Sequence, residues 1–240
     1  MLEAAASLET TSIWTYFYAP TLAAAGFQPV IAALQRGIAL RNLQNIDVWC
    51  CALGDAHFCE FLEDLRFSGC AKQMVGSLFS ECRICVEGAC ALASLLRRDR
   101  LPTLEVLGLS SNDGIGDEGI VPLAGALCEA PRTILRQLNL QDVGLGNEGM
   151  AALASVIDQG RLGQIEYLDL FVARGVTDDG IITLAKVIDA RKLPEVRFMS
   201  VHQLHKTGLT TLGLDAICQA SVNSCPKLNE FYMDDYPDQD

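Results

Sequence analysis

An internal repeat of about 31 residues constrains this chain more than any other feature of its sequence. The pattern LxxLxL, with apolar residues at its first, fourth and sixth places, begins at Leu104, Leu135 and Ile165. Weaker copies extend it, so that first places lie at residues 43, 74, 104, 135, 165, 196 and 228. One step further back reaches Ile13, where aromatic residues take the apolar places. Such a period is the signature of stacked repeats, and it predicts eight short strands, one in each repeat.

A second signature keeps the same period. After four of the strands, a glycine opens a run in which leucine and alanine follow at helical spacing, at Gly88, Gly119, Gly149 and Gly180. Acidic residues accompany these glycines, where they favour the positive end of a helix dipole: Glu87, Asp117, Glu118, Glu148, Asp178 and Asp179. Each unit is therefore predicted to be a strand, a turn and a helix, with parallel strands joined by right-handed crossovers.

Together the two motifs resemble the ribonuclease-inhibitor-like subfamily of leucine-rich repeats, which is shared with NOD-like receptors and the activating protein of the Ran GTPase. The resemblance covers roughly residues 13–240 and implies an α/β solenoid, a horseshoe with a parallel sheet on its concave side and helices on its convex side. We expect a single leucine-rich-repeat domain over residues 1–240. Its ends are a degenerate repeat at 13–42 and a strand with an acidic tail at 228–240.

Two features depart from this subfamily. Periods of 30 to 32 residues are slightly long for it. The turn at Val176 and Thr177, with Cys225 and Pro226, is more similar to the cysteine-containing repeats of F-box proteins. No F-box is evident upstream, so an F-box-like substrate receptor lacking its F-box is an alternative and not the main expectation.

The net charge of the chain limits the kinds of partner that it is expected to bind. The 240 residues contain 30 acidic and 18 basic side chains, for a formal net charge of −12. Such a surface repels nucleic-acid phosphates and anionic lipids, so we expect no nucleic acid and no membrane. The uncharged stretch at 10–35 has no basic segment before it and contains Pro20 and Pro29, unlike a signal peptide or a membrane span. We expect a cytoplasmic, reducing location.

Ten cysteines raise the question of metal or redox chemistry. Cys82 and Cys85 form a CxxC pair, but no second pair follows at the spacing of a zinc site. Cys51 and Cys82 both lie eight residues after the first place of their repeats, and Cys59 and Cys90 both lie sixteen after it. These equivalent positions indicate core ladders, the former bonding the turn backbone. We expect ten reduced thiols, no metal and no cofactor.

Nothing specific predicts catalysis. Three histidines are few for acid–base chemistry, and a cysteine–histidine nucleophile pair stays open as an alternative. The glycines at 108, 114, 116 and 119 lack the order of GxGxxG or GxxxxGK, so we interpret them as turn residues and not as a nucleotide site. Regulation of a small GTPase is an alternative carried by fold resemblance alone, with no catalytic asparagine or arginine matched.

The concave face is the predicted binding surface. Side chains alternate along a strand, so places three, five and seven of each repeat face outward, and these columns contain no lysine or arginine. The last three strands concentrate large and acidic side chains, and the predicted partner-binding residues are Tyr167, Asp169, Phe171, Phe198, His202, Glu230, Tyr232 and Asp234. Aromatic anchors ringed by acids suit a protein partner with a basic surface. Alternatively, the aromatics pack on one another or under the tail at 234–240.

A smaller aromatic candidate lies at the other end, where the same count places Thr15, Phe17 and Trp49 on the concave face. Burial by the N-terminal cap is the alternative there. The sequence thus predicts a non-enzymatic protein–protein interaction module that acts as an adaptor, an inhibitor or a subunit of a larger assembly.

Overall fold

The structure is a computed structural model. It describes residues 13–18, 43–50, 52–68, 70–131, 133–171, 173, 175–201 and 209–232. Eight parallel strands form one sheet in chain order. They are β1 (Ile13–Tyr18), β2 (Leu43–Trp49), β3 (Gly76–Ser80), β4 (Val106–Gly108), β5 (Gln137–Asn139), β6 (Tyr167–Asp169), β7 (Phe198–Ser200) and β8 (Glu230–Tyr232). The predicted α/β solenoid is confirmed, with a strand in each of the eight predicted repeats.

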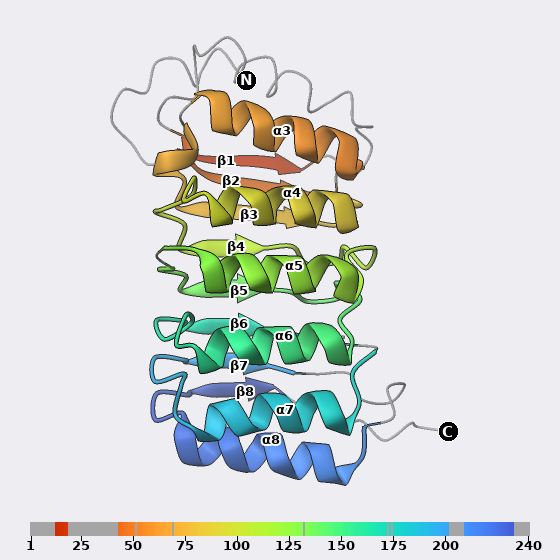
Figure 1. Ribbon diagram of the computed structural model, residues 1–240, viewed down its shortest axis with the longest axis vertical. Coiled ribbons are helices and arrows are strands. Elements are labelled where there is room, and N and C mark those ends of the chain that lie inside the picture. The colour runs from red at the N-terminus through yellow and green to blue at the C-terminus, as the bar shows by residue number, and fades with distance from the viewer. Residues whose placement is uncertain are drawn as a thin grey trace.

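The described helices lie in one layer against one face of the sheet, and the repeats stack along the long axis of the molecule (Figure 1). They are α3 (Gly54–Ser68), α4 (Val86–Arg97), α5 (Gly116–Glu129), α6 (Asn147–Asp158), α7 (Asp178–Asp189) and α8 (Thr211–Ser224), with a short 3-10 helix, η2 (Cys70–Gln73), before β3. Each helix from α3 to α7 packs on the next one along the chain. The opposite face of the sheet, called the open face below, is the one predicted to be concave.

The core lies between the sheet and the helices. Leu107, Leu138, Leu168 and Met199 are aligned in register across β4 to β7, and each is at most 1% exposed. The six leucines predicted to be buried are all confirmed as core residues: Leu107, Leu109, Leu138, Leu140, Leu168 and Leu170. Because the fourth and sixth places point inward, the third, fifth and seventh places belong to the open face.

The first repeat departs from the predicted register. A β-bulge between β1 and β2 sets Trp14 beside Asn45, and from there on Phe17 pairs with Val48. Counting from the first places of the two repeats predicts that Thr15 aligns with Asn45 and Phe17 with Asp47. That prediction is wrong by one residue. A one-residue slip exchanges the two faces of a strand. The pattern missed the slip because a bulge adds one residue to β2 without changing its apolar alternation.

The glycines of the second signature lie inside the first helical turn and do not open it. Gly88, Gly149 and Gly180 are the third residues of α4, α6 and α7. A Cβ atom on Gly149 would lie 2.5 Å from Oδ1 of Asp117, and one on Gly180 would lie 2.5 Å from Oδ1 of Asn147. Gly149 and Gly180 are therefore required as glycines, because a polar side chain of the preceding repeat occupies the space that a Cβ atom would need.

Those polar side chains cap the helix of the following repeat. Their Oδ1 atoms accept a hydrogen bond from the backbone N–H of the residue just before that helix. We call these bonds the inter-repeat caps; they join Cys85 to Asp55 (2.6 Å), Gly146 to Asp117 (2.7 Å), Thr177 to Asn147 (2.9 Å) and Thr210 to Asp178 (2.8 Å). The predicted acids do lie in the first helical turns. Asp117 and Asp178 also tie one repeat to the next.

The cysteine ladders are confirmed in part. Cys82 is fully buried, and its Sγ donates hydrogen bonds to the carbonyl oxygens of Val48 and Ser80. Asn112 holds the equivalent place in the next repeat, where its Oδ1 accepts the backbone N–H of Cys82. Cys51 lies outside the described residues. Cys59 and Cys90 are only partly buried, and they lie on α3 and α4.

Candidate partner-binding surface on the sheet

Three aromatic side chains stand on the open face of the last three strands. The rings of Tyr167 and Phe198 are stacked, with centroids 4.2 Å apart and planes 7° apart. The ring of Tyr232 continues the series at 5.4 Å from Phe198, tilted by 38°. We call these residues the aromatic ladder. The two sequence-based alternatives, an exposed patch and mutual packing, are thus not exclusive, because the rings pack on each other and Tyr232 is still 54% exposed.

The parallel register of the strands builds this ladder. Tyr167 of β6 is aligned with Phe198 of β7, and Phe198 is aligned with Glu230 of β8. Neighbouring strands lie about 4.8 Å apart, which is within the range of offset stacking between aromatic rings. Tyr232 lies two places further along β8 and reaches Phe198 diagonally. Each of the last three repeats supplies one aromatic residue, and the stacking of the repeats brings the three rings together.

Asp169 has a different role from the predicted one. It is only 6% exposed, and its Oδ2 accepts a hydrogen bond of 3.1 Å from the Tyr167 hydroxyl. Its Oδ1 accepts the backbone N–H of Phe171 at 3.0 Å. Asn139 makes the same bond to the N–H of Gln141 in the preceding repeat. Asp169 therefore lies on the open face as the count predicts, but it is not an available acid there, because it is buried and local donors occupy both of its oxygens.

Burial, the charge of Asp169 and the hydrogen bond to it together raise the pKa of Tyr167 to about 12. Each of these effects favours the protonated phenol over the phenolate. Tyr167 therefore presents a neutral ring whose hydroxyl is directed toward Asp169 of its own strand.

Two of the remaining predicted residues, Glu230 and Phe171, belong to the described part of the structure. Glu230 is exposed, and its Oε2 accepts a hydrogen bond of 3.4 Å from the Tyr232 hydroxyl. Phe171 is partly buried at the end of β6. His202 and Asp234 lie outside the described residues. Of the eight predicted residues, six are described. Three form the ladder, and Asp169 and Glu230 accept hydrogen bonds from its hydroxyl groups, with Glu230 the exposed acid of the two.

A row of alternating charges borders the ladder at the start of the strands, and the column count missed it because that count began one place later. Arg136 forms ion pairs with Glu105 at 3.4 Å and with Glu166, and Arg197 pairs with Glu166 at 3.6 Å. We call these four residues the ion-pair row. Its sequence signal was available, because acidic and basic residues alternate at the second place of four successive repeats. The bordering cations are thus neutralised by neighbouring carboxylates.

The second aromatic candidate is supported only at Trp49, which is 49% exposed. The side chain of Phe17 lies outside the described part of the structure, and its register is that of Val48. Beside Trp49, burial raises the pKa of Asp47.

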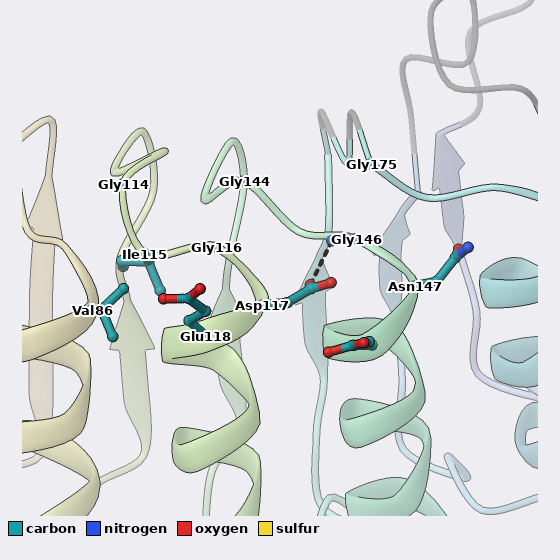
Figure 2. A pocket seen from close by; sticks show the side chains of 11 residues that line it. Val86, Gly114, Ile115, Gly116, Asp117, Glu118, Gly144, Gly146, Asn147 and Gly175 are labelled. Atoms are coloured by element: carbon teal, nitrogen blue, oxygen red, sulfur yellow. Dashed lines mark hydrogen bonds between the residues drawn. The ribbon is translucent and has the colours of Figure 1, made fainter.

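A hollow of about 540 Å³ lies at the turns that lead into α5 and α6 (Figure 2). Its lining includes Gly114, Gly116, Gly144, Gly146 and Gly175, with Asp117, Glu118 and Glu148 among the other residues. Carboxylates thus occupy the helix N-termini that a phosphate would need, one of them bonded to the N–H of Gly146. This arrangement disfavours an anionic ligand such as a nucleotide.

The reading of the glycines as turn residues is confirmed at two of four positions. Gly114 lies in the turn before α5, and Gly116, with a φ of +56°, begins that helix. Gly108 belongs to β4, where a Cβ atom would lie 2.5 Å from Cδ2 of Leu78, and Gly119 lies within α5. Close packing, and not turn geometry, requires glycine at these last two positions.

Comparison with known families supports the repeat assignment. A family model described as Leucine Rich repeat matches residues 100–124 and 133–154. These two segments contain β4 with the start of α5, and β5 with most of α6. No curated protein matches the chain. None of the helices in the described residues has the length and apolar character that crossing a bilayer requires.

Proposed function

We propose that this leucine-rich-repeat chain is a non-enzymatic interaction module that binds a protein partner on the open face of β6 to β8. Leucine-rich repeats generally mediate protein–protein interaction. The observation that carries the proposal is the aromatic ladder, a series of three neighbouring rings on a sheet face that no helix covers among the described residues. We further propose that residues 1–240 form one repeat domain of the ribonuclease-inhibitor-like subfamily. In this proposal the protein works in the cytoplasm as an adaptor, an inhibitor or a subunit of a larger assembly.

The ladder has the properties of a binding hot spot. Aromatic side chains bury a large area at a low cost in conformational entropy, and they dominate measured interface energies. Tyr167 is further restrained by its bond to Asp169, and Phe198 by the rings on either side of it. Because these rings are ordered before binding, little additional entropy is lost when a partner covers them.

Charge indicates a partner with a basic surface. The chain has a net charge of −12, and the outward columns of the repeats contain no lysine or arginine. In the described part of the chain, Arg136 and Arg197 precede β5 and β7 and are paired within the ion-pair row. The resulting negative field attracts cationic surfaces, and it acts mainly on the rate of association. No observation on the described residues favours a GTPase regulator or an F-box-like receptor over this function.

Affinity capture with mass spectrometry tests the proposal. The variant combines Tyr167→Ala, Phe198→Ala and Tyr232→Ala, and the control combines Val121→Ala and Leu212→Ala, two exposed apolar residues of α5 and α8. We expect the ladder variant to lose at least one protein that the wild type and the control both retain. Circular dichroism must show that both variants are folded. A set of partners that depends on the helix residues and ignores the ladder would contradict the proposal.

Kinetics with the captured partner provide a second test. Rising ionic strength should slow association, because salt screens the steering charges. Phe198→Ala should mainly speed dissociation, since it removes contact area at the centre of the ladder.

A further inference from the structure

The aromatic ladder has a defined direction. Its rings belong to three successive repeats, so it crosses the strands (Figure 1). The step from Tyr167 to Phe198 follows the axis along which the repeats stack, and the step from Phe198 to Tyr232 is diagonal. Each step of the ladder, 4.2 Å and then 5.4 Å between ring centroids, advances by one strand. A partner element that covers all three rings must therefore run across the strands.

The step length distinguishes between kinds of partner element. On a helix, side chains that share a face recur about every 5.4 Å, once per turn. On an extended chain, side chains that share a face recur about every 6.6 Å, twice the rise per residue. The helical repeat matches the ladder more closely at each step, and the mismatch of an extended chain accumulates over three rings. One helical row can thus place one apolar side chain against each ring.

The flanks of the ladder are polar. At the start of the strands lies the ion-pair row. Two places beyond Tyr167 and Phe198 lie Asp169 and Ser200, which are 6% and 3% exposed. The apolar strip is therefore about one side chain wide. Such a strip fits the narrow apolar stripe of an amphipathic helix, whose other faces are polar.

Acidic residues are concentrated in the sequence at the β8 end of the ladder. Glu230 of β8 is exposed beside Phe198. The sequence that follows Tyr232 contains four aspartates and no lysine or arginine. A basic segment of the partner is accordingly attracted to the β8 end.

From these observations, and on the basis of the proposed function, we infer that the partner element on the ladder is an amphipathic helix. It crosses β6, β7 and β8, inclined toward the ends of the strands at Tyr232, with apolar side chains at spacings of three and four residues against Tyr167, Phe198 and Tyr232. Its lysine or arginine residues lie toward β8.

The test uses a displayed library of random peptides of about 16 residues, enough for four helical turns. The full chain is the target, and binders are sorted by their loss on Phe198→Ala and their retention on Val121→Ala, a change at an exposed apolar residue of α5. We expect Phe198-dependent binders to carry apolar residues three and four apart, with lysine or arginine elsewhere. As synthetic peptides they should weaken at least about tenfold on Phe198→Ala, as for a hot-spot residue. A central proline should abolish their binding, because it breaks a helix.

Other outcomes separate this inference from the proposed function. If Phe198-dependent binders alternate apolar and polar residues and tolerate a central proline, the partner is extended; the helix is then wrong and the proposed binding face stands. If no binder is recovered, or if binders are indifferent to Phe198→Ala, both are wrong. Tyr232→Ala, a change at a half-exposed residue, repeats the sorting in case Phe198→Ala fails to fold, which thermal melting detects.

Discussion

The hydroxyl of Tyr167 donates a hydrogen bond of 3.1 Å to Oδ2 of Asp169, two residues further along the same strand. The other carboxylate oxygen of Asp169 accepts the N–H of Phe171 at the strand end. One buried carboxylate thus orients the first ring of the aromatic ladder and closes the turn that follows.

The phenol of Tyr167 should ionise at a higher pH than an ordinary tyrosine. Its pKa, raised to about 12 by burial and by Asp169, lies above the value near 10 expected in the unfolded chain. The folded state therefore holds the proton more tightly, and this stability is complete below about pH 10 and is lost as the pH rises toward about 12. The difference in tyrosinate absorbance between the wild type and Tyr167→Phe measures it. A difference titration centred near pH 10 would contradict the prediction.

Leu138→Ala should lower the free energy of unfolding by about 2 to 5 kcal/mol, through lost burial and a residual cavity. Leu138 is fully buried in the centre of the leucine column. Urea denaturation measures the change. Val121→Ala, at an exposed helix position, is the control and should cost less than about 0.5 kcal/mol. Equal midpoints for the two variants would show that the register is incorrect.

Asp117→Ala should destabilise the chain by about 1 kcal/mol, because the N–H of Gly146 loses its acceptor at the start of α6. Glu118→Ala is the matched control, since it removes a carboxylate from the same first turn of α5 without breaking an inter-repeat cap. The difference between the two denaturation midpoints isolates the cap. A larger effect at Glu118 would mean that the helix dipole, and not the cap, carries the energy.

Asp178 should control part of the acid limb of stability. The side-chain hydroxyl of Thr210, followed by its N–H and that of Gly213, lowers the pKa of Asp178 below its ordinary 3.8. This stability is present above pH 3.8 and is lost as the pH falls through the lowered pKa. Asp178→Asn should keep a cap at neutral pH, since Asn147 forms the equivalent one with an amide.

Urea midpoints measured from pH 7 down to about pH 2 follow this titration. The Asp178→Asn variant should lose less stability over that range than the wild type. The control is Asp179→Asn, a change at an exposed residue of the same turn. Parallel acid limbs for wild type and Asp178→Asn would contradict the assignment.

The thiols should differ in reactivity according to burial. We expect ten reduced cysteines in the chain. Iodoacetamide should modify the exposed Cys85 first, and Cys82 and Cys225 only after unfolding, because they are 0% and 5% exposed. Burial also raises the pKa of Cys225 to about 11, which leaves little of the reactive thiolate at neutral pH. Peptide mass spectrometry with and without urea checks the order, and a disulfide mass would contradict the reduced state.

The sequence by itself determined the architecture of this protein. A period of about 31 residues placed every strand, and the apolar places within it identified the core, including Leu107, Leu138 and Leu168. This was possible because side-chain direction alternates along a strand and each repeat buries the same face against its neighbours. The aromatic residues of β6, β7 and β8 followed from the same count.

Only the tertiary structure decided how polar side chains are used. A carboxylate in an outward column has the same sequence pattern whether it is exposed, like Glu230, or is buried and bonded to nearby donors, like Asp169. Asp117 likewise looked like an ordinary acid at a helix start, although its bonding partner lies 29 residues away. The β1 register depended on a bulge. These choices are made between repeats, where hydrogen-bond donors compete for each acceptor within distances of about 3 Å that a one-dimensional period does not specify.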